Sequence, residues 1–157
     1  MHVPEAGARA ALAAVIRKDI ATAQRLTEML QVLPADAAYP DAAAQGYALH
    51  NIYGALENIF EQVSRTFENH VTDPAQWHRE LLTKMFLEIP RIRPAVLPVD
   101  LRGFLNDLRG FRQVFRHAYE FELDAVKLAL LVRNWNKSRG PLISSLSRFR
   151  DNLLGEI

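Results

Sequence analysis

Apolar positions recur every three or four residues through most of the chain, which is the spacing of one face of an α-helix. A first stretch of this kind runs from about residue 5 to residue 32. A second, from about residue 47 to residue 70, has one regular apolar stripe: Leu49, Ile52, Tyr53, Leu56, Ile59, Phe60, Val63 and Phe67. We expect both stretches to be amphipathic helices, joined by the proline-containing connection at residues 33–46.

A third helix is predicted after Asp73-Pro74, which has the form of an N-cap followed by proline at the first helical position. Its apolar positions run from Trp77 to Ile89. The segment "IPRIRPAVLP" then ends it, because proline lacks a backbone N–H and pushes the preceding residue toward extended geometry. We expect this segment to be a surface crossover or hinge.

The last third of the chain predicts two more helical regions. One begins near Val99-Asp100, and its expected buried side is Leu101, Phe104, Leu105, Leu108, Phe111 and Phe115. "FELD" interrupts the pattern with acidic caps, and a fifth helix follows from about Asp124 to Lys137. Gly140-Pro141 should kink or break this helix before a final amphipathic segment. The predicted architecture is an all-α, up-and-down bundle of about five helices.

Composition narrows the class of protein. A chain of 157 residues suits one domain with a core of its own, and we expect residues 1–157 to form that domain. The absence of cysteine excludes a thiolate nucleophile and a cysteine-based zinc site, and it fits a reducing, cytoplasmic location. No apolar run approaches the roughly 18 residues that cross a bilayer, so no membrane role is expected. The net charge of +1 means that any attraction for nucleic acid must come from local patches.

One such patch lies on the fourth helix, in "FRQVFRHAYEFELD". Arg112 and Tyr119 lie on the edge of the apolar stripe, and His117 lies on its flank. Between Leu101 and Ala118 the charged residues are four arginines and a single acid, namely Arg102, Arg109, Arg112, Arg116 and Asp107. Two structural explanations compete with a functional one: Arg112 could extend to water, or it could pair with a carboxylate of a neighbouring helix.

The functional interpretation is phosphate chemistry. Arginine offers a bidentate fork to phosphate oxygens, and histidine titrates near neutral pH. His117 would act as general base or acid at the 2′-hydroxyl and the leaving oxygen of RNA, while Arg112 stabilises the charge of the transition state. Arg109 and Arg116 would support RNA binding on the same helix. One arginine and one histidine are a sparse catalytic set, and two copies across a two-fold axis would be a fuller one.

Other candidate features are weaker. From Arg133 to Arg150 the chain has five basic residues and no acid, with Trp135 and Phe149 among them. A solvated helix face is the favoured interpretation, and an RNA- or partner-binding surface is the alternative. His50, Glu57 and Glu61 on the second helix could be ligands, but charges on the outer face of a helix are more often solvated. No metal site and no cofactor are predicted.

"RQVFRHAY" has the form Arg-x4-His-x-Tyr and resembles the signature of the HEPN superfamily, in particular the HepT-like ribonuclease toxins. The blocks "YALHNIYGALENIFEQVSRTFE", "WHRELLTKMFLEIPRIRPAV" and "FRHAYEFELD" resemble successive blocks of the HepT-like branch. Together they span residues from about 47 to 124. One departure is Gln113, which follows the motif arginine where this superfamily often has asparagine. Gln113 can still donate and accept hydrogen bonds.

The resemblance implies a helical bundle that forms a two-fold homodimer with paired motifs lining a cleft. It implies a metal-independent endoribonuclease toxin with Arg112 and His117 as catalytic residues and Gln113 in a supporting role. The implied partner is a minimal nucleotidyltransferase antitoxin that transfers AMP to Tyr119, which would place a negative group beside Arg112. It also makes Glu57 and Trp77-His78 candidates for the wall of the cleft. The alternative is a non-catalytic helical module that binds a nucleotidyltransferase partner or a nucleotide.

Overall fold

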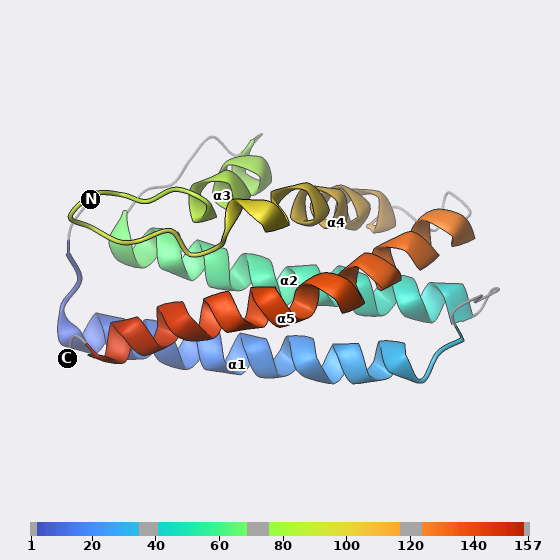
Figure 1. Ribbon diagram of the computed structural model, residues 1–157, viewed down its shortest axis with the longest axis horizontal. Coiled ribbons are helices and arrows are strands. Elements are labelled where there is room, and N and C mark those ends of the chain that lie inside the picture. The colour runs from blue at the N-terminus through green and yellow to red at the C-terminus, as the bar shows by residue number, and fades with distance from the viewer. Residues whose placement is uncertain (1–2, 35–40, 69–75, 117–123, 156–157) are drawn as a thin grey trace.

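The computed structural model describes residues 3–34, 41–68, 76–116 and 124–155. The elements in chain order are α1 (Ala6–Gln31), α2 (Asp41–Phe67), α3 (Trp77–Met85), the short 3-10 helix η1 (Val99–Leu101), α4 (Arg102–Phe115) and α5 (Ala125–Gly155). The long helices α1, α2 and α5 pack together along the long axis, while α3 and α4 follow one another along α2 (Figure 1). The predicted all-α bundle is confirmed for the described residues, in which every named element is helical.

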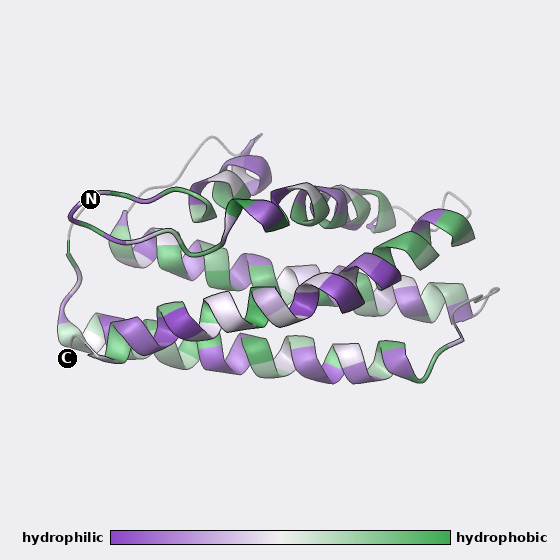
Figure 2. Cartoon of the chain, in the orientation of Figure 1, coloured by the Kyte–Doolittle hydropathy of each residue, from purple (hydrophilic) through white to green (hydrophobic). Residues whose placement is uncertain are grey.

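The apolar stripe of α2 forms the centre of the core. Every large side chain of this stripe except Phe67 is at most 1 % exposed, and Phe67 is 5 % exposed. Burial of one such side chain stabilises the fold by roughly 1.5–3 kcal/mol, so this stripe is a major source of the bundle's stability. Hydrophilic and hydrophobic residues alternate along α1, α2 and α5 in Figure 2, as expected for helices with one buried side.

Helix α2 begins at Asp41, earlier than the predicted start near residue 47. Alanine-rich sequence at residues 42–44 has high helix propensity and extends the helix through the predicted connection. Gly46 is tolerated inside the helix because the α4 side chain of Phe115 packs directly on it. A Cβ at Gly46 would lie 2.8 Å from a ring carbon of Phe115. The glycine interpreted as part of a connection therefore marks a close helix–helix contact.

The segment after α3 crosses to α4 with exposed prolines, as predicted, but Arg93, Val96 and Leu97 fix it to the core. Helix α3 ends at Met85 and not near Ile89. The Met85 carbonyl accepts hydrogen bonds from the backbone N–H groups of Val96 and Leu97 at 2.9 and 3.0 Å, and both of these side chains are buried. The last carbonyls of a helix have no N–H partner within the helix, and here the following segment supplies the donors for Met85. The predicted start at Asp73-Pro74 lies outside the described residues.

Helix α5 continues through Pro141, so of the predicted kink or break at Gly140-Pro141 the break is wrong. Pro141 is exposed, so the carbonyl that loses its amide partner is on the solvent side of the helix. The buried positions continue past it with Leu142, Leu146 and Phe149, and α5 packs on α1. Burial of this stripe outweighs the lost hydrogen bond. At the start of α5, the Asp124 carboxylate accepts from the N–H groups of Val126 and Lys127, as the predicted acidic cap requires.

Candidate functional site

Arg112 lies in the last turn of α4, on the side that packs against α2. Its Nη1 donates a hydrogen bond to the backbone carbonyl of His50 at 3.1 Å and lies 3.5 Å from His50 Nε2. Within the described part of the chain, no carboxylate pairs with Arg112. Its Nη2 has no hydrogen-bond partner there either. The guanidinium is therefore anchored at one nitrogen and keeps donors for another group.

Gly54 makes room for this guanidinium. A Cβ at Gly54 would lie 2.8 Å from Arg112 Nη1, closer than side-chain contacts allow. A glycine inside a strongly helical stretch costs about 1 kcal/mol relative to alanine, and a close contact of this kind is a reason to retain it. His50 and Gly54 thus form a seat for Arg112 on one face of α2. Sequence reasoning did not assign this role to either residue.

His50 contacts Arg112 through both its backbone carbonyl and its ring. Its pKa is lowered from its ordinary value by burial and by the positive charges of Arg112 and Arg116. Because arginine only donates, His50 Nε2 must accept, and the ring hydrogen is then on Nδ1. Nδ1 is buried without a partner among the described residues. The ring of Phe115 packs on this imidazole at 5.2 Å between centroids, which keeps it in place.

Gly54→Ala tests whether the seat positions Arg112. We expect the free energy of unfolding to change by no more than about 1–2 kcal/mol, because the helix preference of alanine offsets part of the hydrogen bond that Arg112 loses. The activity that depends on Arg112 should fall, because the guanidinium has to leave the His50 carbonyl. Gly103→Ala on α4 is the matched control, since a Cβ at Gly103 meets no atom within 4 Å. Equal effects of the two changes on activity would contradict the proposed seat.

A second polar pair lies further along α2. Glu57 is 5 % exposed and its Oε2 lies 2.8 Å from Nδ1 of His78 in the first turn of α3. A carboxylate accepts, so this contact places the hydrogen of the neutral imidazole on Nδ1 and leaves Nε2 available. The Trp77 ring packs against the His78 ring with centroids 4.6 Å apart. The residues that the resemblance placed at a cleft wall therefore contact one another.

His78 lines a cavity of about 230 Å³ between α3 and α4. The other residues that line it are Gln76, Arg79, Arg109 and Gln113. Arg109 and Gln113, predicted as supporting residues, therefore lie together, one turn apart on α4. Arg116, the third predicted supporting residue, is exposed at the C-cap of α4 and does not line this cavity.

Tyr53 is a further polar side chain of α2, in the interior of the bundle. Its side chain is fully buried and its hydroxyl has no hydrogen-bond partner among the described residues. Burial and the charge of Glu57 raise the pKa of this hydroxyl far above its ordinary value, although Arg109 and Arg112 act in the opposite direction. The Tyr53 hydroxyl is therefore held in its neutral form, between the charge of Glu57 on α2 and the charges of Arg109 and Arg112 on α4.

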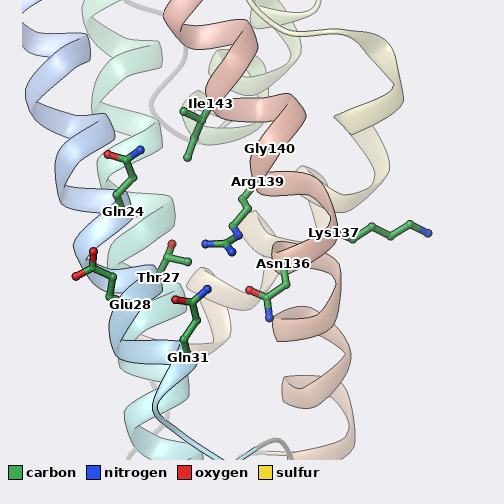
Figure 3. Close-up of a pocket in the computed structure, with 9 residues that line it drawn as sticks. All are labelled: Gln24, Thr27, Glu28, Gln31, Asn136, Lys137, Arg139, Gly140 and Ile143. Carbon is green, nitrogen blue, oxygen red and sulfur yellow. The ribbon is translucent and has the colours of Figure 1, made fainter.

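A larger cavity of about 790 Å³ lies between α1 and α5, and no residue of α4 lines it. Figure 3 shows the Arg139 side chain extending between these two helices. The basic segment at residues 133–150 contributes Lys137 and Arg139 to this cavity. Its aromatic residues are core residues: Trp135 is fully buried and donates from Nε1 to Thr27 Oγ1 at 2.9 Å, and Phe149 is 4 % exposed. They are unavailable for stacking on bases.

His117 and Tyr119 lie outside the described residues, so their roles remain predictions from the sequence. Within the part of the chain that the structure describes, no group of three or more His, Cys, Asp or Glu side chains is arranged to hold a metal ion. In the same part, none of the helices combines the length and the apolar character that a bilayer span requires.

Comparison with protein families gives a match over most of the chain. A family model described as HepT-like protein matches residues 44–153, which is more than half of the chain. The chain therefore belongs to the HepT-like protein family, and the resemblance found in its sequence blocks is confirmed. Neither the curated proteins nor the solved structures contain a significant match.

Proposed function

We propose that the protein is a metal-independent RNA endonuclease and the toxin of a toxin–antitoxin pair, with Arg112 and His117 as its catalytic residues. The observation that carries the proposal is the set of contacts that Arg112 makes. Its guanidinium is held against α2 by the His50 carbonyl, has no carboxylate partner among the described residues, and keeps Nη2 free for a substrate oxygen. Membership of the HepT-like family supports the same function.

The chemistry is a transesterification within RNA. His117 takes the proton of a 2′-hydroxyl, the 2′-oxygen attacks the adjacent phosphorus, and the bond from phosphorus to the 5′-oxygen breaks. A proton delivered to this leaving oxygen completes the step. Arg112 stabilises the additional negative charge that develops on the phosphate oxygens. Two copies of the chain across a two-fold axis would place two arginines and two histidines around one substrate.

RNA cleavage in EDTA is the direct test of this function. We expect the purified protein to cleave RNA under these conditions, and His117→Ala to reduce the cleavage rate by about 10²–10⁴-fold, as expected for a lost general acid or base. Arg133→Ala is a control that removes an exposed basic residue of α5. A parent protein that cleaves no RNA and does not slow growth would exclude the enzyme and favour the binding module.

Tyr119 is the proposed site of neutralisation by a nucleotidyltransferase antitoxin. Coexpression with such an enzyme should add the mass of one or more AMP units, measured by intact-protein mass spectrometry. The added phosphodiester would place negative charge where the substrate phosphate must approach Arg112. The added mass should be absent from Tyr119→Phe and present in the control Tyr47→Phe, which changes an exposed tyrosine of α2. Added mass that persists in Tyr119→Phe would place the modification elsewhere.

A further inference from the structure

We propose that the cavity between α3 and α4 is a second phosphate-binding site, which holds an RNA backbone phosphate next to the one that is cleaved. The site consists of His78, Arg79, Arg109, Gln76 and Gln113. The assignment of its ligand to RNA rests on the proposed function. The binding of a phosphate group rests on the cavity alone.

Among the residues that the structure describes, the lining of the cavity consists of two arginines, one histidine and two amides, and none of these described residues is a carboxylate. Among the described residues, the exposed side chain of Arg79 has no hydrogen-bond partner, and that of Arg109 has only a 3.5 Å contact from Nη2 to Asn106 Oδ1. Arg109 Nε is buried and unpaired in this part of the chain. Such donors would gain full hydrogen bonds from an anion.

His78 is oriented for this ligand by its neighbour. The buried Glu57 binds Nδ1 from the side of α2, so the ring is held and Nε2 is the remaining polar atom. The cavity also lies at the first turn of α3, where the N-cap residue Gln76 makes no side-chain capping bond. Backbone N–H groups at a helix N-terminus favour an anion and add to the charge of the two arginines.

The size and position of the cavity identify the part of the ligand that enters it. About 230 Å³ is below the roughly 300–1,000 Å³ of pockets that enclose whole small molecules. A phosphate group would fit, while its sugar and base would remain outside. Arg109 and Gln113 are one turn apart on α4 and flank the Arg112 position, so a strand bound at Arg112 would have its neighbouring phosphate near this cavity.

The test is a titration of the full-length protein followed by NMR of its histidine side chains. The His78 signals are assigned with His78→Asn, in which the amide nitrogen can keep the bond to Glu57. Inorganic phosphate is added at constant ionic strength, with chloride as the reference anion. We expect a saturable shift of the His78 signals. Arg79→Gln and Arg109→Gln should each raise the dissociation constant about tenfold or more, since each removes charge-assisted hydrogen bonds.

Arg102→Gln is the matched control, because Arg102 is an exposed arginine of α4 that does not line the cavity. It should leave the dissociation constant unchanged. A DNA oligonucleotide, which lacks the 2′-hydroxyl needed for cleavage, should displace phosphate at a lower concentration than AMP does. Displacement by AMP alone would overturn the assignment to the nucleic acid backbone.

Two further outcomes distinguish failure of the phosphate site from failure of the proposed endonuclease function. If the His78 signals do not respond to phosphate, or respond equally in all three arginine variants, the phosphate site is wrong, whether or not the protein cleaves RNA. If the His78 signals respond as expected and the protein cleaves no RNA, the proposed endonuclease is wrong and the phosphate site stands.

Discussion

Arg112→Ala should reduce the rate of RNA cleavage by about 10²–10³-fold, the usual effect of removing one group that stabilises charge in a transition state. The structure gives the reason for a loss of this size. Arg112 is held by the His50 carbonyl on α2, so its guanidinium is already oriented before substrate binds. A donor fixed in advance stabilises developing charge without the cost of reorganisation. Single-turnover cleavage with enzyme in excess measures the chemical step directly.

The same variant should remain folded, which distinguishes a catalytic arginine from a structural one. An arginine paired with a buried carboxylate would leave that charge uncompensated on removal, at a cost of about 3–5 kcal/mol. Arg112 has no such partner among the described residues, and its Nη1 contacts only the His50 carbonyl and His50 Nε2 there. Loss of this charge-assisted bond should cost about 1.5–3 kcal/mol or less in urea unfolding. A variant that unfolds while any folded fraction cleaves normally would assign Arg112 to structure alone.

Arg112→Lys separates the geometry of the guanidinium from its charge. Lysine keeps the positive charge but lacks the planar fork, so it cannot hold the His50 carbonyl and a phosphate oxygen in the same arrangement. Cleavage should therefore remain well below the parent rate. Arg102→Lys is the control on the exposed side of the same helix and should leave the rate unchanged. Full activity in Arg112→Lys would show that charge alone is sufficient.

The helices themselves were predictable from apolar spacing, because burial of one stripe dominates the energy of each helix. The stripe of α2 is where the spacing places it, and the 3-10 helix η1, which leads directly into α4, begins at the predicted Val99. The errors came from proline and glycine, whose effects depend on tertiary contacts. Pro141 lies within α5 because it faces solvent, and Gly46 lies within α2 because Phe115 packs on it. Neither fact can be derived from local sequence.

The candidate site, like the fold, was predictable only in the features that lie on a single helix. Spacing on one helix identified the edge of the α4 stripe, where Arg112 lies half-buried. The contacts to that edge come from residues about sixty positions earlier, namely His50 and Gly54 on α2. The pairing of Glu57 with His78 likewise joins two helices. Periodicity describes one helix at a time, so contacts between helices become visible only when the bundle is assembled.

Arg93→Ala should lower the free energy of unfolding by about 3–5 kcal/mol, because it leaves a buried ion pair without one of its partners. Arg93 is 3 % exposed and its Nη2 donates to Glu68 Oε1 at 2.7 Å. The same guanidinium donates to the carbonyls of Leu87, Pro94 and Lys84. Its removal leaves the buried Glu68 carboxylate and three carbonyls without this partner. Urea unfolding of the variant and the parent measures the difference.

Arg65→Ala is the matched control for this change. Arg65 also pairs with a glutamate, Glu61 at 2.8 Å, but its side chain is 61 % exposed. Exposed pairs of this kind contribute about 0–1 kcal/mol, so the control should differ little from the parent. If Arg93→Ala and Arg65→Ala lowered the free energy of unfolding by similar amounts, burial would not explain the contribution of the Arg93–Glu68 pair to stability.

The pH dependence of stability gives an independent measure of the same pair. Burial alone would raise the pKa of Glu68, but hydrogen bonds from Arg93 and Ser64 and the charges of Arg93 and Lys84 lower it below its ordinary value of 4.5. A glutamate whose pKa is lower in the folded protein adds stability that is complete above the unfolded pKa and is lost as pH falls through the folded pKa. The parent should therefore lose stability below about pH 4.5 more steeply than Glu68→Gln, in which this group no longer titrates. Parallel curves for the two proteins would mean that Glu68 is not held in its charged form by Arg93.

The double variant Glu68→Gln with Arg93→Met should be more stable than Arg93→Ala, because it removes both buried charges together.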